Sequence, residues 1–161
     1  MNLKPLVLIV SGIVLAGVLG WGILRQPVIN DIVTDFNEIP QFRYLKVKDH
    51  GGDAVLKIQR AAYPGITALQ LDLPLLVVFE KALGIAKNEG WQIVYSDPAT
   101  GRIEATAQSR LFRFKDDVLI LMSLVPSGTQ IDMRSLSRVG KSDLGANAKR
   151  IQSFFKKLAT P

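Results

Sequence analysis

Two stretches of the sequence carry charged and polar residues at mainly alternate positions. They are Glu104, Thr106, Gln108 and Arg110 in the first, and Asp132, Arg134 and Arg138 in the second. Because residues two apart share one side of a strand, both sets are expected to project from the same face of a sheet if the register permits. Arginine binds carboxylate or phosphate through paired hydrogen bonds, so this face is a candidate for anion binding or protein docking. The alternative is a solvated face with weak ion pairs.

The interaction surface predicted on this face is defined by its charged members, which are Glu104, Arg110, Asp132, Arg134 and Arg138. The sequence shows no recognisable catalytic arrangement beside it. His50, the only histidine, lies in a Gly-rich turn, and no Gly-x-Ser-x-Gly motif accompanies it. We therefore expect a protein that is not an enzyme, with no catalytic, cofactor-binding or metal-binding residues.

A phosphate-binding loop and a carboxylate pair are both weak alternatives. Gly140-Lys141-Ser142 ends like a phosphate-binding loop, but Ser135 stands where the first glycine of that motif is needed. Asp116 and Asp117 are adjacent in the sequence, so they do not face one substrate together. The sequence thus favours a turn before a helix at the first place and a strand-connecting turn at the second.

The elements that must position the polar face are strands joined by short turns. Apolar runs and alternating patterns predict strands at 43–47, 91–95, 103–114, 118–125 and 131–139. The turns between the last four are too short for a crossover, so the sheet is expected to be antiparallel. Helices are predicted at 54–62, 72–90 and 142–158.

The two longer helices each carry an apolar stripe. The stripes are Leu75, Leu76, Phe79, Leu83 and Ala86 in the first helix, and Leu144, Ala148, Ile151, Phe155 and Leu158 in the second. Ser142 or Asp143 is placed to cap the first turn of the second helix. These stripes predict an α+β fold, a two-layer sandwich in which two helices cover one antiparallel sheet.

The N-terminal segment has the composition of a membrane anchor. Residues 5–24 contain no charged residue, and twenty helical residues span about 30 Å, the hydrocarbon thickness of a bilayer. The residues that define the predicted anchor are Leu6, Val10, Val14, Leu19, Trp21 and Leu24. A cleaved secretory signal and a buried core helix are the alternatives.

The predicted organisation is a transmembrane anchor at 1–25, a linker at 26–42 and an α+β domain at 43–161. Basic residues flank the apolar segment on both sides, with Lys4 before it and Arg25 after it. We expect a single-pass protein of the cell membrane with its domain on the extracytoplasmic side, periplasmic or lumenal. The lipid bilayer is then one partner, through residues 5–24.

The charge of the chain is concentrated in its second half. The net charge is +6, and residues 102–161 hold eleven of the 20 Lys and Arg residues but five of the 14 Asp and Glu residues. In a membrane-tethered protein, a basic face can meet anionic lipid or an acidic partner. No nucleic-acid-binding motif accompanies the charge, so nucleic acid is not an expected partner. The absence of cysteine excludes disulfides and thiolate sites.

Several motifs together resemble a known bacterial family. They are Gly90-Trp91-Gln92-Ile93-Val94, Gly101-Arg102-Ile103-Glu104-Ala105-Thr106, Phe114-Lys115-Asp116-Asp117-Val118 and the run Ser137-Arg138-Val139-Gly140-Lys141-Ser142-Asp143-Leu144-Gly145-Ala146-Asn147. They are similar to the domain of unknown function 1499 family over about residues 30–158. The resemblance implies a small domain, often preceded by a hydrophobic segment, and it implies no established activity. Arg113 departs from the family pattern, where a small residue is expected.

These observations lead to three functional hypotheses. The first is a membrane-anchored, non-enzymatic interaction domain, an accessory subunit of a larger complex with a membrane protein partner. The second is a binding module for a lipid or another amphiphilic small molecule, held between the sheet and its helices. The third is an uncharacterised enzyme.

Overall fold

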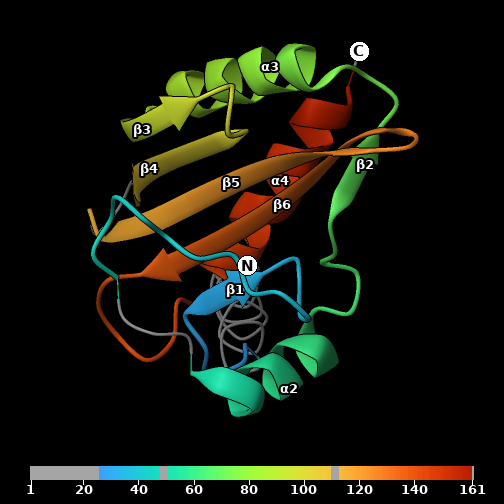
Figure 1. Ribbon diagram of the computed structural model, residues 1–161. Helices are drawn as coiled ribbons and strands as arrows, with labels where there is room; N and C mark the ends of the chain where they lie inside the picture. The colour runs from blue at the N-terminus through green and yellow to red at the C-terminus, as the bar shows by residue number, and fades with distance from the viewer. Residues whose placement is uncertain (1–25, 48–50, 110–112, 161) are drawn as a thin grey trace, which may run out of the picture.

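The computed structural model describes residues 26–47, 51–109 and 113–160, and these form a six-stranded sheet with three helices (Figure 1). The strands are β1 (Asp31–Val33), β2 (Leu69–Leu71), β3 (Gln92–Asp97), β4 (Arg102–Gln108), β5 (Lys115–Val125) and β6 (Gly128–Ser137). The helices are α2 (Gly52–Ala62), α3 (Leu75–Asn88) and α4 (Ala146–Ala159). The α+β class predicted from the sequence is confirmed.

Every strand pairing in the sheet is antiparallel, as the short turns predicted. The strand order is β1-β6-β5-β4-β3, and β2 pairs with β6 farther along its outer edge. The long strand β6 thus carries two short strands, one near each of its ends. Figure 1 shows β5 and β6 running through the middle of the sheet.

Helices α3 and α4 cover one face of the sheet, and the hydrophobic core lies between them. The core side chains from the helices include Val78, Phe79, Ala82, Ala148, Ile151 and Phe154, and those from the strands include Ile103, Ile120, Ile131 and Met133. Each set follows the period of its element, 3.6 residues in the helices and two in the strands. The two-layer arrangement of sheet and helices is the one that the apolar stripes predicted.

The segment predicted to be a linker is part of the fold. Strand β1 lies within residues 26–42 and pairs with β6, with Ile32 opposite Ser135. Ile32 and Val33 are completely buried. The folded part of the chain therefore begins before residue 43, and residues 43–47, predicted to be a strand, form bends at 43–45 and irregular structure at 46–47.

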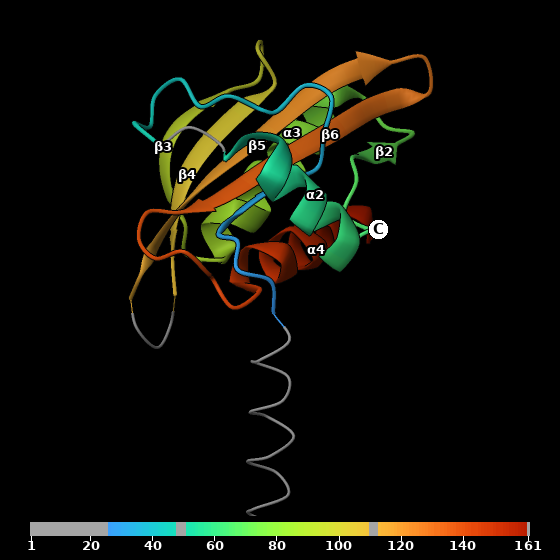
Figure 2. The same cartoon turned by 90° about the horizontal axis from the view of Figure 1, so that it is seen from below.

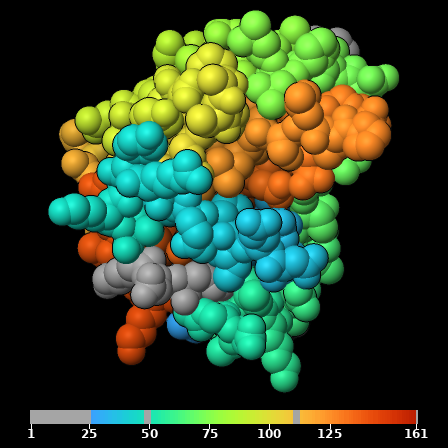
Figure 3. Space-filling view, viewed as in Figure 1, coloured from blue at the N-terminus to red at the C-terminus, as the bar shows by residue number. Residues whose placement is uncertain are grey.

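Residues 35–47, which we call the cover segment, cross the face of the sheet that the long helices leave open (Figure 1). In the space-filling view the cover segment lies over the middle strands (Figure 3). The sheet is thus covered on both faces, by helices on one and by an irregular segment on the other. This second cover decides the environment of the predicted polar face.

Helix α2 protects the outer edge of β1 through one glutamine. The side-chain amide of Gln59 is completely buried. Its Oε1 accepts a hydrogen bond from the Val33 N–H at 3.1 Å, and its Nε2 donates to the Val33 carbonyl at 2.6 Å. The amide thereby satisfies the backbone groups that a further strand would otherwise bind.

Replacing Gln59 with leucine is expected to lower the free energy of unfolding by about 2 kcal/mol or more. The substitution leaves a buried donor and a buried acceptor of Val33 without partners, and each such group costs about 1–3 kcal/mol. Urea denaturation followed by circular dichroism measures the effect. Lys57→Leu, at an exposed position of the same helix, is the control, and an equal loss in both variants would contradict the assigned role.

No helix in the described ranges has both the length and the apolar character needed to cross a bilayer. The predicted anchor residues Leu6, Val10, Val14, Leu19, Trp21 and Leu24 lie outside the described residues, as does His50.

The first described residues, 26–30, run beside the loop that precedes α4. There the Ser142 hydroxyl donates to the Pro27 carbonyl at 3.2 Å, and the Asp143 N–H donates to the Ile29 carbonyl at 3.2 Å.

Candidate functional site

The predicted polar residues do share one face of the sheet, but the cover segment buries most of them. The register places Glu104 opposite Leu119 and Leu119 opposite Arg134. The exposed fraction is 0% for Glu104 and 1% for Arg134. Asp132 is also buried, and Arg110 lies outside the described residues. The face is thus neither the solvated surface nor the open docking surface that the sequence suggested.

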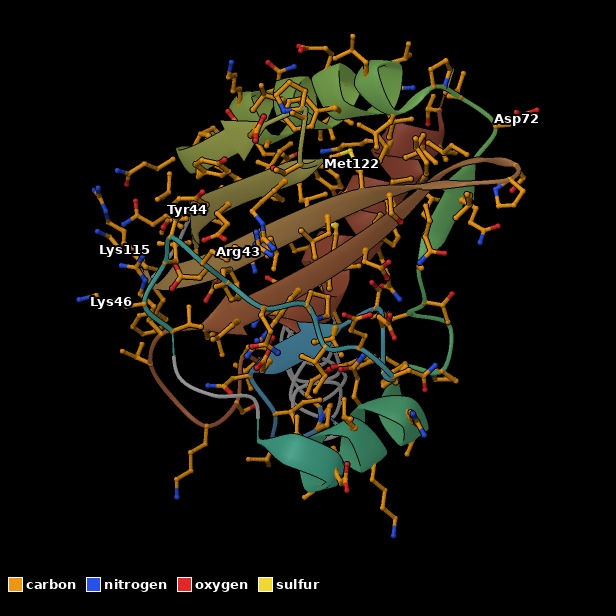
Figure 4. All side chains as sticks on the ribbon, viewed as in Figure 1. Arg43, Tyr44, Lys46, Asp72, Lys115 and Met122 are labelled. Carbon is orange, nitrogen blue, oxygen red and sulfur yellow. The ribbon has the colours of Figure 1, made fainter. Side chains whose placement is uncertain are left out.

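Glu104 binds the backbone of the cover segment. Its carboxylate accepts hydrogen bonds from three successive backbone N–H groups, those of Arg43 at 2.7 Å, Tyr44 at 3.0 Å and Leu45 at 2.9 Å. Arg102 donates to the same carboxylate at 2.9 Å and to the Gln41 carbonyl at 3.0 Å. Figure 4 shows Arg43 and Tyr44 on the segment that crosses in front of the strands. The carboxylate therefore fixes the segment over the sheet.

Arg134 links the cover segment to strand β1. Its Nε and Nη2 donate to the two carboxylate oxygens of Asp31 at 3.1 and 2.8 Å. Its Nη1 donates to the Pro40 carbonyl at 3.1 Å, and the guanidinium lies 5.4 Å from the centre of the Phe42 ring. The bidentate binding expected for an anion is thus made to a carboxylate of the chain itself.

Arg138 and Asp132 also have partners within the domain. Arg138 donates three hydrogen bonds to Asp117 and one to the Thr106 hydroxyl. The bonds to Asp117 raise the pKa of Arg138. Asp132 accepts hydrogen bonds from the Thr34 hydroxyl and the Gln130 amide, both at 2.8 Å. We conclude that this face closes the fold and holds the cover segment.

Two tyrosines stack where the cover segment meets strand β3. The rings of Tyr44 and Tyr95 have their centres 3.7 Å apart with planes at 13°. The pKa of Tyr95 is raised from 10.0 to about 12, first by its hydrogen bond with Tyr44, then by burial, and then by Asp97. The pKa of Asp97 is lowered, first by the Ala99 backbone N–H and then by the Thr100 hydroxyl.

Tyr44→Phe is expected to lower the pKa of Tyr95 from about 12 toward 10, because the largest cause of the shift is removed. Tyrosinate absorbance during a pH titration measures this change. A raised folded-state pKa stabilises the fold below the unfolded value of 10 and loses that contribution as the pH rises toward 12. Tyr63→Phe is the control, and a titration in Tyr44→Phe that matches the wild type would contradict the assignment.

The second candidate is an apolar hollow of about 370 Å³ at the start of β5, which we call the base hollow. It is lined by Ser109, Phe114, Asp116, Ser137, Val139, Gly140, Ser142, Asp143, Leu144 and Ala146. Most of its surface is apolar although it is open to solvent. An open apolar surface of this kind is a candidate binding site on a folded domain.

The base hollow was not predicted from the sequence, because Leu144 falls on the apolar stripe expected for the last helix. The helix begins two residues later, at Ala146, and Leu144 is 53% exposed. Leu144 also adopts φ = 54°, a left-handed conformation that costs a residue with a Cβ about 1–2 kcal/mol. An exposed apolar side chain in a costly conformation makes Leu144 a candidate contact residue.

A polar network holds the wall of the base hollow in place. Asp143 accepts the backbone N–H groups of Gly145 and Asn147, both at 2.8 Å, and so binds a first-turn N–H of α4, whose N-cap residue is Gly145. The Asn147 side chain donates to the Asn30 carbonyl and the Ser137 hydroxyl, both at 3.0 Å. Behind the hollow, Arg150 donates to Asp116 at 2.5 Å. Side chains of residues 137–147, the longest run that resembles the family, therefore hold the loop between β6 and α4 in place.

A third feature is an exposed apolar surface at the opposite end of β5, which we call the far-end surface. It consists of Leu73, Leu76, Val77 and Leu124. Leu124 lies opposite Thr129 in the sheet, and the Thr129 hydroxyl donates to the Leu73 carbonyl at 2.8 Å. Leu76 was predicted to be buried with the stripe of its helix, but it is 58% exposed because it lies on the outer side of the first turn of α3.

The far-end surface and the base hollow lie at opposite ends of the molecule. Strand β5 runs from Lys115 to Val125, and eleven residues of strand span about 35 Å. Phe114, which lines the base hollow, precedes the strand, and Leu124 lies near its end. Figure 2 shows the β5–β6 hairpin far from the first described residues.

The arrangement of the described residues defines an α+β domain whose polar sheet face is covered by its own chain. The chain matches the family described as "Protein of unknown function (DUF1499)" over residues 31–158. It therefore belongs to this family, as the resemblance of its motifs indicated. The match begins at the first residue of β1, which agrees with the place of this strand in the fold. No curated protein matches the chain.

Within the described ranges, no three His, Cys, Asp or Glu residues are grouped so that they could hold a metal ion.

Arg113, which departs from the family pattern, adopts φ = 55°. A left-handed conformation favours glycine, which explains why a small residue is expected there. The base hollow and the far-end surface are two features of the described residues that remain open to a partner.

Proposed function

We propose that this chain is a membrane-anchored, non-enzymatic interaction domain and an accessory subunit of a membrane protein complex. The anchor is residues 5–24, whose length and lack of charge suit a bilayer. The charge distribution around this segment favours a domain on the extracytoplasmic side of the cell membrane. The proposal needs a surface that can bind a protein at a distance from the anchor.

The far-end surface is the observation that carries this proposal. Leu76 and Val77 lie on the first turn of α3 and Leu73 just before it, and Leu124 lies on the β5–β6 hairpin and is 74% exposed. The fold uses other side chains for its core, so these residues are available to a partner. An apolar group surrounded by polar residues is typical of protein interfaces. Because it lies at the far end of β5, it is directed toward the part of a membrane protein outside the bilayer.

Charge variants test this surface. Leu76→Asp and Leu124→Asp are expected to remove the partner from the full-length chain purified from native membranes, because each places a charge in an apolar interface. Asn88→Asp is the matched control, since it adds the same charge at an exposed position of α3. Circular dichroism confirms that the variants fold. A partner profile unchanged in both leucine variants would contradict the proposal.

Binding of an amphiphilic small molecule is the second candidate function, and the base hollow is the observation that favours it. Buried side chains fill the core between the sheet and the helices, where the sequence placed such a ligand. We therefore assign the ligand site to the open base hollow of about 370 Å³. Mass spectrometry of the chain purified in mild detergent tests this candidate. A lipid retained by the wild type and lost in Leu144→Asp would support it, and an absence of retained lipid would contradict it.

A further inference from the structure

The base hollow presents apolar side chains at the end of the domain where the described chain begins. Val139 and Leu144 are both more than half exposed, and they lie on the loop between β6 and α4. Residues 27 and 29 bind this same loop through their carbonyls. The uncharged segment ends at residue 24, and three extended residues reach about 10 Å. The hollow therefore lies close to whatever surrounds that segment.

Basic residues lie next in sequence to residues that line the base hollow, with Arg113 and Lys115 on either side of Phe114, and Lys141 between Gly140 and Ser142. Arg113, Lys115 and Lys141 are exposed, and Arg138 keeps 40% of its side chain exposed. Figure 4 shows Lys115 at the edge of the molecule, where Lys46 of the cover segment also lies.

The acidic residues of this region offset the charge of Arg138 and Arg150 but leave that of Arg113, Lys115 and Lys141. Asp116 is buried and bound to Arg150, and Asp117 is buried and bound to Arg138. Asp143 is bound to the backbone at the start of α4. The rim that faces solvent is therefore positively charged.

An apolar centre with a rim of lysine and arginine is the chemistry that binds the surface of an anionic membrane. Apolar side chains enter the region between headgroups and acyl chains, and each nearby Lys or Arg gains about 1 kcal/mol from anionic lipid. A hydrophobic segment of a protein partner would match the apolar centre but would not need the basic rim. The charge therefore favours lipid.

We propose that the base hollow and its basic rim contact the anionic leaflet beside the anchor, with Val139 and Leu144 in the interfacial region. We call this membrane-contact site the seat. This inference rests on the anchoring part of the proposed function and is independent of the far-end surface. The seat holds the domain in one orientation, with the β5–β6 hairpin directed away from the membrane.

The absence of cysteine makes a direct test possible, because a single introduced cysteine carries the only label. The full-length chain is placed in lipid nanodiscs, with an environment-sensitive fluorophore at Leu144→Cys or, as control, at Leu124→Cys. Nitroxide groups on the upper acyl chains quench fluorophores that enter the membrane interface. We expect strong quenching at position 144, none at 124, and more quenching at 144 in phosphatidylglycerol-containing discs than in phosphatidylcholine alone.

The rim is tested with the label at Val139→Cys. Lys115→Gln together with Lys141→Gln is expected to shift the equilibrium away from the seated state by about fivefold for each lysine in anionic discs. Equal quenching at positions 144 and 124 in chains that stay in the discs would overturn the seat and leave the anchor intact. Failure of the chain to stay in the discs would overturn both. Photo-crosslinking from position 144 to a protein instead of lipid in native membranes would also overturn the seat.

Discussion

Replacing Arg134 with methionine is expected to lower the free energy of unfolding by about 3–5 kcal/mol, because it leaves the Asp31 carboxylate buried without its cation. Arg134 is 1% exposed and donates two hydrogen bonds to Asp31 and one to the Pro40 carbonyl. Methionine keeps much of the side-chain length and apolar surface, so the loss reports the charge and its hydrogen bonds. Urea denaturation measures it.

Two further variants separate the ion pair from packing. Arg60→Met removes an exposed arginine of α2 whose guanidinium lies over the Phe36 ring, so a smaller loss is expected. In the double variant Asp31→Asn with Arg134→Met, neither member of the pair is charged, so the double variant is expected to be more stable than Arg134→Met alone. Equal losses in Arg134→Met and Arg60→Met would contradict the role of Arg134 in the closed face.

Glu104→Gln is expected to cost about 3–5 kcal/mol and to release the cover segment. The amide has almost the shape of the carboxylate, but it lacks the charge that binds Arg102 and the three backbone N–H groups of the cover segment. Hydrogen bonds to charged groups contribute about 1.5–3 kcal/mol each, and part of this is kept by the amide oxygen. The expected result is therefore large although the substitution is nearly isosteric.

Hydrogen exchange distinguishes release of the cover segment from general destabilisation. In Glu104→Gln, the amides of residues 43–45 are expected to lose their protection while those of β5 keep it under native conditions. Glu89→Gln, which removes a partly exposed carboxylate paired with Lys157, is the control. Protection that falls equally in the cover segment and in β5 would show that Glu104 does not act locally.

The sheet and its long helices could be predicted from the sequence because their side chains follow regular periods. Strands β4 and β6 alternate, β5 is nearly all apolar from Val118 onward, and short turns join the three strands, so their antiparallel pairing followed. Lys115, Asp116 and Asp117, assigned to a turn, begin β5 instead. The three residues of β1 are too few to show a period. They were assigned to a linker because proline and acidic residues surround them.

The polar face was predicted correctly in its position but not in its environment, and the linker assignment explains why. Glu104 and Arg134 were expected to face solvent because nothing in the sequence indicated that residues 35–47 return across the sheet. Glu104 binds backbone N–H groups, and every residue type except proline offers such a group. A contact of this kind leaves no signal in the sequence of the segment that is bound.

The two open surfaces were missed for a related reason. Leu76 and Leu144 fall on the helical period, so both were assigned to buried stripes. Leu144 instead precedes its helix, and Leu76 lies on the outer side of the first turn of α3. Periodicity is least reliable at the ends of elements, and here the ends carry the surfaces on which the proposed function depends.

The most direct test of the interaction domain is photo-crosslinking in native membranes from a photoreactive residue at position 76. The same residue at position 88 is the control, because both positions are exposed on α3 and twelve helical residues separate them by about 18 Å. The account predicts a crosslinked membrane protein from position 76 that is absent from position 88. Crosslinks to the same proteins from both positions, or to none from position 76, would contradict it.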